Sequence, residues 1–335
     1  MHATSDTKLK PIIGPAAWKG PAIAGDPAWV HRFTAAEIAE LDRAIKMAKA
    51  TGKPLGQLTR EDFDLPHLAP VIRGWMKSLN RGRGFVLVKG FPVFDYATQD
   101  LEIAYWGLGR HMGDPVPQNR TGDLLGHVRD TGEIKTNPKV RLYKTTKRQD
   151  FHADGSDIVG LFCLRRAKSG GLSQIVSSIS IYNEFVRRRP DLVPLLFEPL
   201  HWDRAGEYLP GEKPWMKMPI AYVANGHIRM FYIGWYIRDG QQYPEVPRFT
   251  KAQTEMLDLI EEIANDPAFH LTMDFEPGDI QFLKNSTILH CRTEYEDFDE
   301  PEKKRHLLRL WLTAREFDDG DERLRQGFAN GEAAQ

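Results

Sequence analysis

The chain has few cysteines, no long apolar run and almost no net charge. Two of its 335 residues are cysteine, which excludes a disulfide framework and favours a reducing compartment, so we expect a cytoplasmic protein. No stretch approaches the ~20 apolar residues of a membrane-spanning helix, and the N-terminal residues lack the apolar segment of a secretory signal. A formal net charge of −1 indicates no general attraction to nucleic acid or to a membrane.

Two common signatures of enzyme active sites are also missing. The sequence contains no Gly-x-Ser-x-Gly and no Gly-x-Gly-x-x-Gly, so it shows neither the nucleophile turn of serine hydrolases nor a dinucleotide-binding loop. It has no internal repeat, no low-complexity tract and no clear linker. With 41% hydrophobic and 27% charged residues, the composition is that of an ordinary globular protein. We expect one domain over residues 1–335.

The N-terminal third reads mainly as helices around one strand. An irregular arm of about thirty residues, rich in proline and glycine, comes first. A helix then begins with a capping box formed by Thr34 and Glu37 and ends at Gly52. Further helices are expected over 69–84 and 95–113, with a buried strand at 84–91 between them.

From about residue 124 the pattern changes to short apolar or alternating runs, which are typical of β-strands. Asn225-Gly226 marks a two-residue hairpin turn, and helical inserts are expected near 180–197 and 250–266. Many short strands with turn signals between them favour a sandwich or barrel of the jelly-roll kind. The expected strand runs are 124–130, 140–146, 157–165, 173–178, 220–237, 269–275, 279–285, 288–295 and 305–314.

A histidine and an aspartate two residues apart stand in the stretch KRQDFHADGSDIV. Side chains at i and i+2 of a strand point to the same face, so His152 and Asp154 would present an imidazole and a carboxylate together. Two histidines and one carboxylate form the facial triad of non-haem Fe(II) oxygenases. The alternative is a polar strand end at which Asp154 opens a turn into Gly155.

A third ligand would have to come from elsewhere, and His290 in PGDIQFLKNSTILHCR is the candidate. This histidine has Ile288, Leu289 and Cys291 around it, so a buried core histidine is the competing interpretation. Cys291 does not form a catalytic pair with His290, because adjacent strand residues point to opposite faces.

The segment KKRHLLRLWLTA places two arginines on one face of a strand. Arg305, Leu307, Arg309 and Trp311 share that face, and His306, Leu308, Leu310 and Leu312 share the other. A guanidinium within such an apolar strand requires an anionic partner, and its planar fork suits a carboxylate. That carboxylate can belong to a protein Asp or Glu or to a small diacid.

Taken in order, His152-x-Asp154, SGGLSQIVSS, PGDIQFLKNSTILHCR and RHLLRLWL resemble the taurine/2,4-dichlorophenoxyacetate dioxygenase family of Fe(II)- and 2-oxoglutarate-dependent oxygenases. The resemblance covers roughly residues 80–315. It implies a mainly β fold with helical decoration around a double-stranded β-helix, a jelly-roll or cupin-like core. Residues 1–80 carry none of the family's motifs and are expected to form an arm and helices packed on that core.

The resemblance also assigns roles. It implies His152, Asp154 and His290 as iron ligands, Ser173 as a hydroxyl that bonds 2-oxoglutarate, and Arg309 as the clamp on the distal carboxylate of 2-oxoglutarate. Arg305, four residues earlier on the same face, is the competing candidate or a helper. Fe(II), 2-oxoglutarate and O₂ are the implied cofactor and cosubstrates, and the presence of Asp154 argues against a halogenating variant.

The implied reaction oxidises an unactivated C–H bond of a small organic substrate and releases succinate and CO₂. Hydroxylation is the default outcome, with desaturation, ring closure or ether cleavage as alternatives on the same centre. Two other classes compete: a non-enzymatic jelly-roll binding protein, and a zinc hydrolase that uses the same ligands. No carboxylate has an obvious general-base spacing for the hydrolase, whereas Arg309 has a natural role with an anionic cosubstrate.

Candidate substrate contacts are less specific. Gln118 and Asn119 are polar residues on the proline-containing loop MGDPVPQNR, where turn-stabilising roles compete with substrate binding. Tyr143 and Arg148 are further candidates. The expected partner is a small molecule, with neither nucleic acid nor membrane, and a homo-oligomer is compatible with the sequence.

Overall fold

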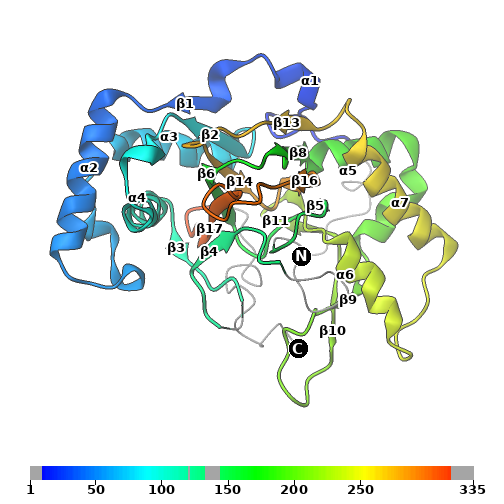
Figure 1. Cartoon of the computed structure of the whole chain (residues 1–335). Helices are drawn as coiled ribbons and strands as arrows, with labels where there is room; N and C mark the ends of the chain where they lie inside the picture. The colour runs from blue at the N-terminus through cyan, green and yellow to red at the C-terminus, as the bar shows by residue number, and fades with distance from the viewer. Residues whose placement is uncertain (1–9, 120, 133–143, 318–335) are drawn as a thin grey trace.

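The computed structural model describes residues 10–119, 121–132 and 144–317. Helices lie on two sides of a strand-rich centre (Figure 1). The described α-helices are α1 (Gly20–Ile23), α2 (Ala35–Ala50), α3 (Leu68–Arg81), α4 (Thr98–Arg110), α5 (Ser178–Arg188), α6 (Gly234–Asp239) and α7 (Lys251–Asn265). No helix within these ranges is long and apolar enough to cross a membrane.

The larger sheet has the strand order β1-β2-β14-β6-β17-β3, with β4 also paired to β17. β1 runs parallel to β2, and the other pairs are antiparallel. Its strands are β1 (Val30–Arg32), β2 (Phe85–Lys89), β3 (Asp114–Pro115), β4 (Leu125–Val128), β6 (Ile158–Arg165), β14 (Ile280–Lys284) and β17 (His306–Thr313).

The smaller sheet has the order β13-β8-β15-β5 and is antiparallel throughout. Its strands are β5 (Gln149–His152), β8 (Ser173–Ser177), β13 (Leu271–Met273) and β15 (Ile288–Arg292). Three two-stranded ribbons complete the described strands: β7 (Ser169–Gly170) with β16 (Tyr295–Glu296), β9 (Leu200–Asp203) with β10 (Trp215–Met218), and β11 (Ala221–Ala224) with β12 (His227–Met230).

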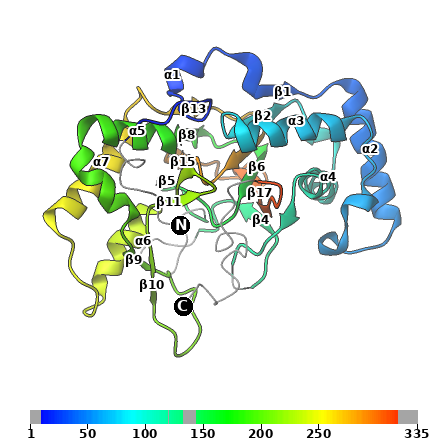
Figure 2. The ribbon, with the colours of Figure 1, turned by 180° about the vertical axis from the view of Figure 1, so that it is seen from behind.

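The two sheets share one apolar cluster and each packs helices on its other face. Leu307 and Trp311 of β17 meet Ile175 of β8 and Ile288 of β15 in the shared cluster. The alternate residues of β17, Leu308, Leu310 and Leu312, join a second cluster with helices α2, α3 and α4. Helices α5 and α7 cover the outer face of the smaller sheet in a third cluster, and the view from behind shows the same arrangement (Figure 2). Alternation along β17 therefore decides which side chains reach the space between the sheets.

The expected helices and turns are largely confirmed. Thr34 and Glu37 form both bonds of the capping box at the start of α2. After the helix, Gly52 adopts a φ of +68°, a conformation that glycine tolerates without strain. Asn225 and Gly226 have φ values of 48° and 80° between β11 and β12, as a hairpin turn with two left-handed residues requires.

Two segments differ from the expected elements, and a third lies mostly outside the described residues. The run 220–237 was expected to be extended throughout, but its last part forms α6 from Gly234, because a short apolar run does not distinguish a strand from a buried helix. The insert near 180–197 divides into α5 and a 3₁₀ helix at Pro190–Phe197, where two prolines prevent a continuous α-helix. The expected strand at 140–146 falls mostly outside the described residues.

Candidate active site

Two histidines lie opposite each other on neighbouring strands of the smaller sheet. His152 ends β5 and pairs directly with His290 in the middle of β15. Their ring centroids are 4.2 Å apart, and both residues are buried. The same pairing puts Gln149 opposite Arg292, with a bulge between the two pairs. The bulge places an interval of three residues on β5 opposite an interval of two residues on β15. Gln149 therefore points to the same side as His152 and lines the pocket.

Asp154 follows β5 in a loop that a single buried side chain holds. The Asp154 backbone N–H donates to Asn285 Oδ1 at 2.9 Å, and Asn285 Nδ2 donates to the Ser156 carbonyl at 2.8 Å. Asn285 is fully buried in the turn between β14 and β15. One amide therefore fastens the loop that carries the carboxylate to the turn that leads into the His290 strand.

The three side chains converge on one small volume. Asp154 Oδ1 lies 3.8 Å from His152 Nε2, and Asp154 Oδ2 lies 3.7 Å from His290 Nε2. One ligand atom from each residue lies within 4.8 Å of the others. The Asp150 carbonyl, 2.8 Å away, accepts from His152 Nδ1, so Nε2 is the ring nitrogen that carries the electron pair. In this structure Nε2 accepts from Gln149 Nε2 at 3.0 Å, a bond that a metal ion at Nε2 would replace.

The charge states suit a cation. Burial lowers the pKa of His152, and burial together with His152 lowers the pKa of His290 to about 3, so both imidazoles are neutral at neutral pH. Burial alone would raise the pKa of Asp154, but the positive charge of Arg309 brings it below its usual value. Two neutral imidazoles and one carboxylate are the protonation states that a divalent metal requires.

The donor set fits a metal ion. Asp154 Oδ2 and His290 Nδ1 are buried without a hydrogen-bond partner among the described residues. A buried carboxylate oxygen with no partner is costly. A divalent ion between the three side chains would satisfy it, and His₂Asp with open positions is a set typical of Fe(II).

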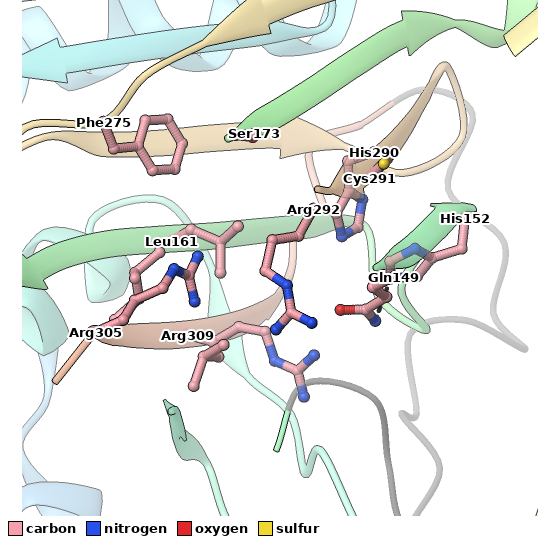
Figure 3. A pocket seen from close by; sticks show the side chains of 12 residues that line it. Gln149, His152, Leu161, Ser173, Phe275, His290, Cys291, Arg292, Arg305 and Arg309 are labelled. Atoms are coloured by element: carbon pink, nitrogen blue, oxygen red, sulfur yellow. Dashed lines mark hydrogen bonds between the residues drawn. The ribbon is translucent and has the colours of Figure 1, made fainter. Parts of the chain in front are cut away.

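The pocket beside this cluster contains Ser173 and three arginines. Figure 3 shows His152, Gln149 and His290 at one end of the pocket and Arg305 towards the other, with Arg292 and Arg309 between them. Ser173 on β8 pairs with Arg292 on β15, and its hydroxyl donates to Gln281 Oε1 at 3.3 Å.

Arg305 and Arg309 share a face of the chain, as alternation predicted, but their surroundings differ. Arg309 Nη1 lies 3.6 Å from Asp154 Oδ1, next to the His–Asp–His cluster. Arg305 is 5% exposed, and its Nη1 has no hydrogen-bond partner among the described residues. Its Nε lies beside Gly171, two residues before Ser173. Arg305 therefore lines the pocket together with Ser173, whereas the Arg309 guanidinium lies beside Asp154.

The candidate substrate contacts do not gather in this pocket. Gln118 is buried, and its amide bonds Arg309 and the Leu124 carbonyl. Asn119 bonds Asp123 and Thr121 in its own turn, which is the turn-stabilising role. Arg148 bonds Asp150 and Asn265 near the surface. Tyr143 lies outside the described residues.

Sequence reasoning missed three residues around the cluster. Arg292 follows His290 by two residues, so strand alternation could have placed it on the same face. Gln149 precedes His152 by three residues, which predicts the opposite face, and only the bulge overrides that parity. Asn285 had no signal beyond its place in an expected turn.

A strand-rich fold with two histidines and one aspartate at the end of a buried pocket is the arrangement of non-haem iron oxygenases. The sequence pattern of the family described as "Taurine catabolism dioxygenase TauD, TfdA family" matches residues 51–311, and the chain belongs to this family. It is therefore a 2-oxoglutarate-dependent non-haem iron dioxygenase, with Fe(II) as cofactor and 2-oxoglutarate as cosubstrate.

Individual relatives agree with this membership. The chain is 30% identical to FR-33289 synthase of Streptomyces rubellomurinus over 90% of both chains. It is 31% identical to the taurine hydroxylase-like protein SAT17 of Stachybotrys chartarum, over 88% of this chain and 77% of the relative. Among solved structures, asparagine oxygenase superposes with a TM-score of 0.66 at 14% identity, covering 85% of this chain and 94% of the oxygenase. The oxygenase OrfP with Fe and alpha-ketoglutaric acid gives 0.60 at 15% identity, with coverages of 85% and 94%. At these identities the structural matches establish a shared fold.

Proposed function

We propose that His152, Asp154 and His290 hold the iron of this dioxygenase and that the enzyme hydroxylates a small organic substrate. The observation that carries the proposal is the convergence of these three buried side chains, with Asp154 Oδ2 lacking a hydrogen-bond partner within the described part of the chain. When bound, iron with 2-oxoglutarate and O₂ supplies the oxidation of an unactivated C–H bond, with release of succinate and CO₂. The solved structures of asparagine oxygenase and OrfP hold hydroxylated amino acids, which favours hydroxylation over desaturation, ring closure or ether cleavage.

The residues of the chain bind and orient the reactants. Arg305 and Ser173 stand on the side of the pocket from which they can bind the distal carboxylate of 2-oxoglutarate, and Arg305 has a buried N–H group directed to no described acceptor. A bidentate guanidinium grip fixes the orientation of a carboxylate. The family resemblance implied Arg309 as the clamp and Arg305 as its competitor, and we instead propose Arg305.

Arg309 has a different position and a different task. At 3.6 Å from Asp154 Oδ1, its guanidinium is too close to the iron ligands to hold the far end of 2-oxoglutarate. It keeps the Asp154 carboxylate ionised and places a positive charge beside the groups that bind the iron. Both tasks depend on a fixed orientation of the Arg309 side chain.

The remaining chain supports this site as one unit. We propose that the two facing sheets form a double-stranded β-helix over about residues 80–315, with the N-terminal arm and helices packed on it in a single domain. The apolar cluster common to both sheets and the packing of α2 and α3 on the larger sheet support this proposal. The two cysteines are free and buried, which suits the reducing cytoplasm.

The test is iron-dependent turnover. Anaerobic protein with Fe(II) is expected to develop a visible charge-transfer band on addition of 2-oxoglutarate, and in air to release succinate. Asp154→Ala is expected to abolish both signals while its unfolding transition stays cooperative. Asp274→Ala, which removes an exposed carboxylate paired with Arg166, is the matched control and should behave as the unsubstituted protein.

Other outcomes would point to the competing functions. Full succinate release by Asp154→Ala would refute the ligand assignment. Unsubstituted protein that binds neither Fe(II) nor 2-oxoglutarate would indicate a binding module, and zinc-dependent hydrolysis without 2-oxoglutarate turnover would indicate a hydrolase.

A further inference from the structure

Gln118 is a buried residue in the loop between β3 and β4. The described hydrogen bonds of its side chain are all made to Leu124 and Arg309. Its Nε2 donates to the Leu124 carbonyl at 3.0 Å and to the Arg309 carbonyl at 2.8 Å. Its Oε1 accepts from Arg309 Nε at 2.8 Å. The side chain is 2% exposed. Gln118 therefore joins its own loop to both the backbone and the side chain of Arg309.

This network allows one orientation of the amide. The two carbonyls require the NH₂ group on their side, and the guanidinium requires the oxygen on its side, because a guanidinium only donates. A flipped amide would place an oxygen against two carbonyls and an N–H against Arg309 Nε. The backbone is held as well, since Gln118 N–H donates to the Asp123 carbonyl at 2.9 Å.

Gly126 on the neighbouring strand β4 leaves room for the Gln118 amide. Gly126 on β4 pairs with Arg309 on β17. A Cβ added to Gly126 would lie 2.6 Å from Gln118 Oε1, closer than such contacts allow. The glycine therefore permits the amide to lie over β4 and reach the Arg309 side chain.

The Arg309 guanidinium donates from its Nε to Gln118, while its Nη1 lies near Asp154. Figure 3 shows the side chain extending from β17 into the pocket. Arg309 Nη1 lies 3.6 Å from Asp154 Oδ1, and the guanidinium carbon lies 4.9 Å from the centre of the Trp311 ring. A free arginine side chain has about 2 kcal/mol of rotamer entropy, so a fixed orientation requires a contact such as the bond to Gln118.

We propose that Gln118 is a positioning residue that acts through Arg309, holding its guanidinium beside Asp154 so that its charge favours binding of 2-oxoglutarate at the iron. The inference rests on the proposed function, because it assumes that 2-oxoglutarate binds at the His–Asp–His cluster. It gives Gln118 a role other than the direct substrate contact expected from the loop sequence.

Two substitutions separate this role from mere packing. Gln118→Glu keeps an oxygen acceptor for Arg309 Nε but removes both N–H bonds to the carbonyls. Gln118→Met keeps a similar volume and removes all three bonds. Both variants are expected to unfold at lower denaturant concentration than the unsubstituted protein, because both leave the carbonyls of Leu124 and Arg309 without this donor.

The experiment is an anaerobic titration of the Fe(II)-loaded full chain with 2-oxoglutarate, followed by the visible charge-transfer band. Gln118→Met is expected to raise the dissociation constant for 2-oxoglutarate roughly tenfold, the lower end for loss of an orienting partner. Gln118→Glu is expected to remain within about twofold of the unsubstituted protein, because its carboxylate still binds Arg309 Nε.

The outcomes are distinguishable. Equal weakening in both variants would assign Gln118 a packing role and overturn the inference, as would equal affinity in all three proteins. Absence of any 2-oxoglutarate-dependent band in the unsubstituted protein would instead refute the proposed function itself.

Discussion

Replacement of Asn285 by alanine is the most informative single change, because one buried amide holds the loop that carries Asp154. Asn285→Ala removes the acceptor of the Asp154 N–H and the donor to the Ser156 carbonyl, at 2.9 Å and 2.8 Å. Neither backbone group then has its partner, and the site is fully buried.

The magnitude follows from those two groups. Each buried polar group left unsatisfied costs about 1–3 kcal/mol, and some relaxation of the loop is expected, so we expect a loss of roughly 2–4 kcal/mol in the free energy of unfolding. A domain of this kind has a stability of about 5–15 kcal/mol, so the variant still folds. The loosened Asp154 loop should also weaken Fe(II) binding by about 10- to 100-fold.

Two measurements on the same samples check this prediction. Denaturant unfolding of metal-free protein gives the loss of stability, and anaerobic Fe(II) titration gives the loss of affinity. Asn119→Ala is the control, since Asn119 also bonds through its amide but in a partly exposed turn, and we expect a change within about 0.5 kcal/mol. A loss below about 1 kcal/mol in Asn285→Ala with unchanged Fe(II) affinity would refute the reasoning.

Three further predictions concern the cosubstrate, the pH response and the core. Arg305→Leu should raise the apparent requirement for 2-oxoglutarate far more than that for iron in succinate-release kinetics; if Arg309→Leu does this instead, the clamp is Arg309. Burial, with His127 nearby, lowers the folded-state pKa of His306 to about 3, so the unfolded chain binds the extra proton and stability should fall as the pH drops below about 6.5. His306→Gln should make that fall shallower in denaturant midpoints, and an unchanged slope would contradict the assignment. Phe282→Ala, at a fully buried position against α3 and α4, should lower the free energy of unfolding by about 3–5 kcal/mol, and a loss under about 1 kcal/mol in chemical denaturation would show that this packing is not as described.

Local pattern was sufficient for the parts of the site that follow strand alternation. A period of two along the β17 segment put Arg305 and Arg309 on one face and Leu308, Leu310 and Leu312 on the other, and the structure confirms both faces. His152, Asp154 and His290 were proposed as iron ligands from the sequence through the family resemblance, because the spacing alone left a polar turn and a core histidine as alternatives. The family resemblance carried by these residues is confirmed by the match over residues 51–311.

Tertiary structure decided the features that depend on contacts between distant segments. Gln149 shares the pocket with His152 because of a bulge that exists only once β5 pairs with β15. Our proposal of Arg305 over Arg309 as the clamp rests on which guanidinium lies beside Asp154, which residue spacing does not report. Asn285 reads as an ordinary turn residue, and Gln118 reads as a candidate substrate contact or a turn residue, yet they hold residues 131 and 191 positions away. A hydrogen bond between such segments is specified by the packing of the whole domain, since no local periodicity encodes it.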